Sequence, residues 1–276
     1  MKKKSLIILI SALLIFAIML SPLGAYGISL GAMSVYSRME AEDSYMAQKG
    51  VRIQIPSGEG WYPFVMTFNA DSGFRGFSGG QADRLTIMYN FPEFDLKRGC
   101  SRIYDDSSPY YSSFYGAYCV EGDYGFDESG SLNVEEAGKI PEYDYTHLVL
   151  QDLGLPVQKQ LFDWQTDEVY GDVKMAGYDG WYAVDAEILA SGILHNKKTF
   201  LRNYIQYGSP GYGTEEDFAP VELFGRVYGK YFEELGASIY FYVISADREV
   251  LNDCDENILQ KSENCRRGTR KVPPSW

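Results

Sequence analysis

Few residues of this chain are spaced in a way that suits hydrolytic chemistry. Gly76-Phe77-Ser78-Gly79-Gly80 has the G-x-S-x-G spacing of a nucleophile elbow. That elbow needs a strand running into the serine and a helix leaving it. Here we expect a loop before Ser78 and a strand after it, from Leu85. The pattern therefore favours a glycine-rich turn between two strands over a catalytic serine.

Histidine and carboxylate ligands for a metal are no better placed. The two histidines, His147 and His195, lie far apart in the sequence, and neither has a zinc or haem spacing. Four acidic residues crowd one glycine-containing loop and have the oxygen ligands that calcium prefers, but their spacing matches no known calcium loop. They are Glu121, Asp123, Asp127 and Glu128. We expect a solvated acidic loop, no metal site and no cofactor.

Paired carboxylates could serve a glycan-directed hydrolase, with Trp61 and Trp181 as platforms for sugar rings. The sequence has 38 Asp and Glu residues, so candidates are abundant, but it brings no particular pair to the separation that the reaction needs. An extracytoplasmic hydrolase therefore stays an alternative, and a role without catalysis is favoured.

Aromatic residues are the better binding candidates, because loops rich in Tyr and Ser supply contact area at low entropic cost. We expect exposed clusters of this kind at Tyr110-Tyr111, Phe114-Tyr115 and Tyr118 in a chain that contains 23 tyrosines. The tryptophans are added as possible platforms, although Trp on a strand is usually part of a core. The candidate binding residues are Tyr110, Tyr111, Phe114, Tyr115, Tyr118, Trp61 and Trp181.

The N-terminal segment, residues 1–33, has the pattern of a membrane-targeting helix. Lys2, Lys3 and Lys4 precede an apolar run that reaches Leu20, and no further charge occurs before Arg38. A basic flank of this kind stays in the cytoplasm while the rest of the chain crosses the membrane. We therefore expect an exported protein.

Two fates of this segment remain open. Small residues in Ala25-Tyr26-Gly27 suit cleavage by a signal peptidase after Gly27, which would release a secreted protein. The uncharged stretch also continues to Met33, which is long enough for one uncleaved helix across a bilayer of about 30 Å. The protein is then anchored by a single span.

Four cysteines form an even set on the expected oxidising side of the membrane, where disulfides persist. Cys100 and Cys119 flank the Tyr/Ser-rich loop and are a possible pair. Cys254 and Cys265 lie near an expected helix, which would have to end early to allow a bridge. The alternative is that all four remain reduced or pack as small apolar side chains.

The pattern of the remaining chain predicts one α+β domain: a mostly antiparallel β-sheet with a few packed helices, a C-terminal helix and the N-terminal membrane-targeting helix. Residues 221–232 fit a helix or a strand, and Gly225 and Gly229 favour the strand. Two hairpins are expected: one pairs strand 51–55 with strand 61–68, and the other pairs 173–178 with 181–188 through a turn at Asp179-Gly180. Further strands are expected at 85–91, 112–120, 199–207, 221–232 and 238–244. Expected helices are 34–49, 147–153, 157–164 and 247–262, with a loop over 121–144.

Four regions follow from this pattern. Residues 1–33 are the signal peptide or anchor, and 34–50 a membrane-proximal helix and linker. Residues 51–263 are the exported domain, and 264–276 a basic flexible tail.

The ends of the exported domain resemble the PsbP/Mog1/DcrB-like group of small α/β/α sandwich proteins. In that group an opening strand has Ile-Pro and soon a Trp, and the chain closes with strands and one helix. Here Ile53-Gln54-Ile55-Pro56 and Trp61 open the domain, and residues 238–244 with the helix reaching Ser262 close it. The middle, 91–172, has no counterpart. The resemblance implies a non-catalytic accessory or binding role and transfers no site residues.

Short internal matches suggest two diverged halves, about 51–150 and 168–262. Gly60-Trp61-Tyr62 recurs as Gly180-Trp181-Tyr182, and Tyr115-Gly116-Ala117-Tyr118 as Tyr228-Gly229-Lys230-Tyr231, in the same order. With 28 glycines and 23 tyrosines such matches also arise by chance, so duplication and coincidence both remain open.

The excess of acidic residues limits the classes of partner that we expect. With 25 Lys and Arg against 38 Asp and Glu, the formal net charge is -13, and a phosphate backbone repels such a surface. We expect no nucleic-acid partner. The sequence therefore predicts a membrane-anchored or secreted, non-catalytic binding or accessory domain whose partner is an envelope protein or glycan; a hydrolase and a structural envelope component are the alternatives.

Overall fold

The structure is a computed structural model that describes residues 3–19, 21–69, 71–97, 100–151, 153–193 and 218–266. Its first elements are two helices, α1 (Lys3–Met19) and α2 (Pro22–Asp43). Ser21 separates them, because its side chain caps the second helix by accepting from the Gly24 N–H at 3.2 Å. Within the described residues, we find no helix with the length and apolar character needed to cross a membrane.

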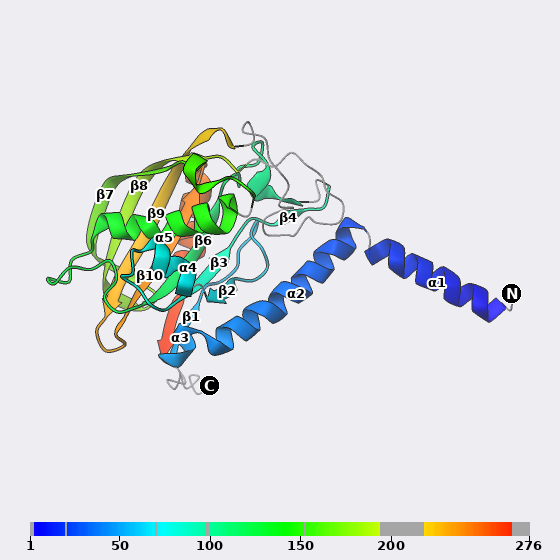
Figure 1. Cartoon of the computed structure of the whole chain (residues 1–276), viewed down its shortest axis with the longest axis horizontal. Helices are drawn as coiled ribbons and strands as arrows, with labels where there is room; N and C mark the ends of the chain where they lie inside the picture. The colour runs from blue at the N-terminus through cyan, green and yellow to red at the C-terminus, as the bar shows by residue number, and fades with distance from the viewer. Residues whose placement is uncertain are drawn as a thin grey trace, which may run out of the picture.

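Helix α1 points away from the rest of the molecule, whereas α2 runs back along it (Figure 1). The short helix α3 (Tyr45–Gln48) follows after a break at Ser44, whose backbone is extended. The expected single helix over 34–49 is therefore two helices, and the first of them begins earlier than predicted. Gly50, with φ of 67°, ends this part of the chain as expected.

A seven-stranded antiparallel sheet with the order β2-β3-β6-β10-β9-β8-β7 is the centre of the molecule. Strong alternation of aromatic and β-branched residues explains why these segments are strands. The strands are β2 (Met66–Asn69), β3 (Leu85–Asn90), β6 (Phe114–Glu121), β7 (Phe162–Met175), β8 (Tyr178–Ser191), β9 (Pro220–Phe232) and β10 (Ala237–Ser245).

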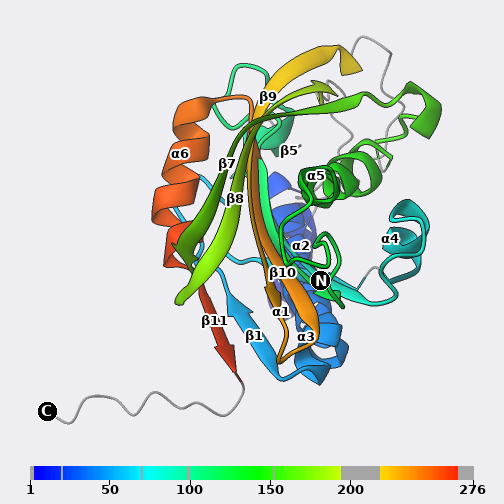
Figure 2. The same cartoon turned by 90° about the vertical axis from the view of Figure 1, so that its left-hand side faces the viewer.

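Helices cover both faces of this sheet (Figure 2). One face packs against α4 (Asp71–Phe77), α5 (Val134–Tyr143) and a π-helix (Asp144–Leu150) that continues α5. The other face packs against α6 (Arg248–Asn257), which Asp247 caps as predicted. The predicted α+β class, with a mostly antiparallel sheet and a C-terminal helix, is therefore confirmed.

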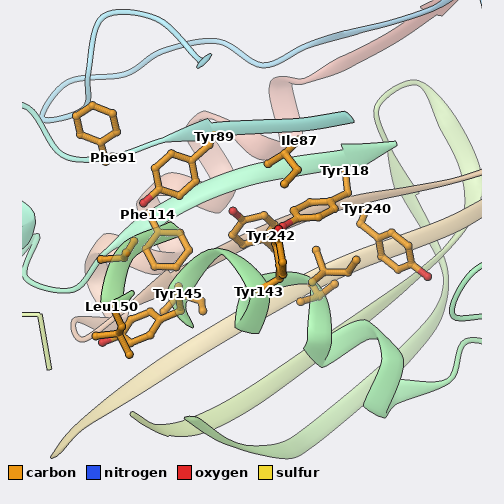
Figure 3. Packing of buried hydrophobic residues seen from close by; sticks show 14 of the residues in the cluster. Ile87, Tyr89, Phe91, Phe114, Tyr118, Tyr143, Tyr145, Leu150, Tyr240 and Tyr242 are labelled. Carbon is orange, nitrogen blue, oxygen red and sulfur yellow. The ribbon is translucent and has the colours of Figure 1, made fainter. Parts of the chain in front are cut away.

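The first of these two cores is dominated by aromatic side chains (Figure 3). Phe114, Tyr118 and Tyr242 lie fully buried between the sheet and the α5 side. Phenol oxygens in such a core need hydrogen-bond partners, and several tyrosines find theirs in carboxylates or backbone carbonyls.

Two small sheets flank the large one. Strand β1 (Val51–Gln54) pairs with β11 (Glu263–Arg266), and β4 (Phe94–Asp95) pairs with β5 (Cys100–Ser101). The expected hairpin of 51–55 with 61–68 is therefore wrong, because β1 finds its partner at the far end of the chain and β2 pairs with β3. The predicted C-terminal tail also begins in an ordered strand; residues 267–276 lie outside the described part.

The segment before β7 differs most from expectation. The predicted loop over 121–144 contains α5, and the predicted helix over 157–164 is a short 3-10 turn (Val157–Lys159) followed by β7. Two further 3-10 turns lie at Arg102–Tyr104 and Leu259–Lys261. The expected strand over 199–207 lies outside the described residues.

The predicted β7–β8 hairpin is present, but its turn is displaced. Met175 pairs with Tyr178, so Ala176 and Gly177 form the turn, with φ of 50° and 84°. Two successive positive φ values are those of the type I′ turn that was predicted for Asp179-Gly180. The register of the two strands shifts at three places along β7: between Thr166 and Glu168, between Tyr170 and Val173, and between Val173 and Met175.

Candidate functional site

An open groove lies on the α6 side of strands β7, β8 and β9. Helix α6 packs on β9 and β10 and leaves the outer part of this sheet face uncovered. The groove has a volume of about 360 Å³, and a smaller hollow of about 50 Å³ adjoins it beside α6. The two share Glu187, Phe224 and Arg248 in their linings.

Residues from three neighbouring strands form the floor of the groove. Gln165 comes from β7, Leu189 from β8 and Glu222 from β9, and all three are exposed. Alternate residues of a strand point to the same face, which explains why Glu187 and Leu189 meet here although Ile188 between them is buried.

Arg248, at the first turn of α6, closes one side of the groove. Its guanidinium lies 3.9 Å from the centre of the Phe224 ring and donates to Glu187 at 2.9 Å. Stacking of a guanidinium on an aromatic ring leaves its edge free for hydrogen bonding. This pair presents an apolar ring, a cation and a carboxylate within one small area.

Arg226 lines the smaller hollow and links β9 to β8 and α6. It donates to both oxygens of Asp185, at 2.6 and 2.8 Å, and to Asp255 at 2.7 Å. The hydrogen bond to Asp185 raises the pKa of Arg226, which therefore stays charged. Tyr228 also donates to Asp255, at 2.9 Å. This network anchors α6 and fixes the wall of the groove.

The aromatic residues predicted to bind a partner lie mostly in the cores. Of the seven, only Tyr110 and Tyr111 are partly exposed. Alternation along β6 sends Phe114 and Tyr118 into the core on the α5 side and Tyr115 into the core on the α6 side. The buried five are Phe114, Tyr115, Tyr118, Trp61 and Trp181. The expectation of an exposed cluster is therefore wrong for Phe114, Tyr115 and Tyr118. Trp61 and Trp181 lie in the core on the α6 side, which was the alternative given for tryptophan on a strand.

Tyr110 remains near one of the tryptophans. Its ring meets the edge of Trp61 at 5.5 Å, and Trp61 meets Tyr115 at 4.9 Å. Trp181 instead packs against Phe241, at 5.6 Å. Trp61 thus contacts two of the predicted binding residues, Tyr110 and Tyr115, whereas Trp181 packs against a residue outside that set.

The other candidates for chemistry have local structural roles. Ser78 is buried directly after α4, so a helix rather than the expected loop precedes it. His147 stacks on Tyr143 at 4.8 Å, and burial lowers the pKa of its imidazole. Asp127 accepts from the backbone N–H groups of Ser129 and Ser131. Among the described residues we find no cluster of side chains suited to hold a metal ion; His195 lies outside them.

The two cysteines whose side chains the structure describes, Cys119 and Cys254, are buried free thiols. For these two cysteines the structure agrees with the alternative of reduced, packed side chains and not with the possible pairs of Cys119 with Cys100 and of Cys254 with Cys265. Cys119 lies in the middle of β6, where it packs in the core on the α6 side, while Cys100 belongs to the separate β4–β5 pair. Burial raises the pKa of the Cys119 thiol to about 12, which keeps it protonated.

Sequence reasoning missed the groove because its residues belong to four separated elements. The segment containing Gln165 was expected to follow a helix, and Glu187, Leu189, Glu222 and Phe224 are unremarkable alternating residues of strands. One signal was present: the polar positions of residues 181–188 and 221–232 fall on the same alternate face. Which strands are neighbours could not be read from it.

Comparison with protein-family models, with curated proteins and with solved structures found no match. The resemblance to the PsbP/Mog1/DcrB-like group therefore stays a prediction. The two halves of a duplication also stay a prediction; Trp61 forms an isolated bridge with Pro92, whereas Trp181 lies within β8.

Proposed function

We propose that this protein is an exported, non-catalytic binding domain that holds an envelope partner in the groove on the α6 side of β7, β8 and β9. The observation that supports this most is the uncovered sheet face, which offers Phe224, Leu189 and Arg248 around a volume of about 360 Å³. An aromatic ring stacked with an arginine is a frequent anchor of protein interfaces.

The engagement of the nearby carboxylates favours binding over hydrolysis. Glu187 is paired with Arg248, and Asp185 is held by Arg226 through two hydrogen bonds. A carboxylate hydrolase needs one acid and one base or nucleophile that converge on a bond between them. Carboxylates tied to arginines from neighbouring elements are better suited to shaping a surface.

The N-terminal helix supports attachment to a membrane. The large apolar side chains of α1 are exposed all round the helix, among them Ile8 at 69% and Phe16 at 61%. Such a surface is unfavourable in water and favourable in lipid. We infer that α1 holds the domain at a membrane surface while the groove remains accessible.

Site-specific photo-crosslinking tests the binding role. A photoreactive amino acid replaces Leu189, on the groove floor, and in a matched variant replaces the exposed Asn257 at the far end of α6. Both full-length variants are irradiated in the membranes of the native host. We expect a discrete adduct from position 189 and none from position 257. Equal labelling from both positions, or none from position 189, contradicts the proposal.

A further inference from the structure

Strand β7 forms the outer edge of the large sheet and borders the groove. It is the last strand in the sheet order, and no described strand pairs with its outer side. From Phe162 to Thr166 its pairing with β8 is regular; the first bulge follows between Thr166 and Glu168. An unpaired, regular edge of this kind is a template for an added strand.

The hydrogen bonds at the start of β7 indicate which backbone groups face outward. The Leu161 carbonyl accepts from the Ser191 N–H at 2.9 Å, so Leu161 is a residue bonded toward β8. Backbone groups of an antiparallel strand alternate between its two neighbours. The N–H and C=O groups of Phe162, Trp164 and Thr166 therefore face the outer edge.

Strand β2 forms the opposite edge of the same sheet, and helix α2 covers it. At β2 the side chain of Ser37 accepts from the Thr67 N–H at 2.9 Å, and Glu40 accepts from the Asn69 N–H at 3.2 Å. Helix α2 thus occupies the hydrogen-bonding groups of that edge. Among the described residues we find no comparable cover over the outward groups of Phe162–Thr166.

The side chains along this edge determine which residue types an added strand should have. Asp163 and Gln165 project to the groove face, whereas Phe162 and Trp164 pack on the α5 side. Exposed carboxylates surround the groove side, and Arg248 neutralises one of them by pairing with Glu187. The exposed acidic residues are Asp163, Asp167, Glu168, Glu187 and Glu222.

We propose that β7 binds an extended segment of a partner protein by strand addition along Phe162–Thr166, and that this segment alternates basic residues facing the groove with apolar residues facing Phe162 and Trp164. This identifies the partner class for the binding role proposed above and rests on it. A second copy of the chain is disfavoured, because pairing of two β7 strands would bring together two edges that have the same exposed carboxylates, Asp163 and Asp167.

Peptide binding to the full-length chain in detergent micelles tests this. The probe is a fluorescent peptide of about seven residues that alternates lysine with valine, a length that suits the five-residue edge. We expect saturable binding that weakens with salt, together with slower hydrogen exchange at the amides of Phe162, Trp164 and Thr166. A peptide with glutamate in place of lysine should not bind.

Two variants separate backbone pairing from side-chain effects. Thr166→Pro removes an outward N–H and should weaken binding about tenfold, whereas Thr166→Ala keeps the N–H and should bind as the native chain does. Asp163→Lys should also weaken binding about tenfold, and Asp179→Lys, at the far end of the same hairpin, should leave it unchanged. If Thr166→Pro does not fold, a lysine–valine peptide methylated at alternate amide nitrogens serves instead and should not bind.

The results distinguish this inference from the proposed function. Crosslinking from position 189 without peptide binding, or peptide binding that neither Thr166→Pro nor amide methylation changes, overturns strand addition and leaves the groove as a binding site for another partner. Absence of both the crosslink and peptide binding overturns both proposals. Slower exchange confined to residues outside Phe162–Thr166 also overturns strand addition.

Discussion

Asp144 is the most unusually placed ionisable residue of the described chain. It lies at the start of the π-helix, fully buried, where Tyr118 donates to one oxygen at 2.5 Å and Tyr242 donates to the other. Burial raises the pKa of the Asp144 carboxyl, and the hydrogen bond from Tyr118 opposes that rise only in part. The core therefore favours the neutral acid, which suits a structural tie between the π-helix, β6 and β10.

Comparing the stability of the native chain with that of Asp144→Asn at several pH values tests whether the pKa of Asp144 is raised. Because the folded-state pKa is raised, the contribution of Asp144 is fully present below its unfolded-state pKa of about 3.9 and is lost as pH rises through the folded-state pKa. Within that window the native chain should lose up to about 1.4 kcal/mol per pH unit relative to Asp144→Asn. Urea unfolding of both proteins from pH 4 to pH 9 measures the difference.

Asp123→Asn serves as the control, because Asp123 is exposed to solvent. Its stability should follow that of the native chain over the whole pH range. A constant difference between the native chain and Asp144→Asn at every pH would show that the buried carboxyl does not titrate in this window.

The types of the individual residues predicted burial poorly for the aromatic side chains of β6. Phe114 and Tyr115 were expected on an exposed surface because tyrosines and serines surround them, yet both are fully buried. The reason is the position of β6, which has β3 on one side, β10 on the other and helices over both faces. Local composition holds no information on how many neighbours a strand will have.

Among the elements, α2 has the least expected role. Predicted as part of a membrane anchor and linker, it packs on the domain and satisfies the free edge of β2. Tyr26 stacks on Phe94 at 5.5 Å, and the Tyr36 and Phe68 rings lie 6.0 Å apart. A helix over an edge strand prevents the pairing with other chains that an open edge invites.

Glu40→Ala tests this role of α2. Its carboxylate accepts from the backbone and the side-chain amide of Asn69, at 3.2 and 2.8 Å. Removing it leaves a partly buried N–H without that partner, so we expect the free energy of unfolding to fall by about 1–2 kcal/mol. Urea unfolding of the full chain measures this.

Glu42→Ala is the matched control. Glu42 lies on the same helix and forms an exposed ion pair with Arg38, so its loss should change stability by less than about 0.5 kcal/mol. Equal destabilisation by both variants would mean that the helix as a whole, and not its cap on β2, determines the effect.

Prediction from sequence succeeded for elements with strong local patterns and failed where the partner was distant. Residues 221–232 and 238–244 alternate over a long stretch, and both are strands as expected. The strand expected at 51–55 is present as Val51–Gln54, but its partner lies more than two hundred residues away, in β11, which no local turn could indicate. Helix α5 was missed because Gly138 and Pro141 interrupt its helical pattern. Glycine is needed at position 138 because a Cβ atom there would lie only 3.0 Å from the Trp164 ring.

For the whole molecule, the distribution of charge and apolar surface suggests a division of roles. The body is acidic, with a net charge of -13 for the chain, and its cores are closed by helices on both faces. Helix α1 is the opposite: it is apolar, it projects from the body, and within the described residues only α2 makes appreciable contact with it. An aqueous environment suits the body, and an apolar one suits α1.

Flotation with lipid vesicles tests this division. The full chain should float with neutral phosphatidylcholine vesicles, because burying the large apolar side chains of α1 in lipid contributes about 0.8 kcal/mol per CH₂ group. Ile10→Lys/Leu13→Lys places two charges in that surface and should reduce the floating fraction at least about tenfold. Gln81→Lys/Gln158→Lys adds the same charge at exposed positions of the body and should float like the native chain. If both double variants float, lipid does not cover α1; if the native chain stays in solution as an oligomer that Ile10→Lys/Leu13→Lys dissociates, α1 is covered by copies of itself.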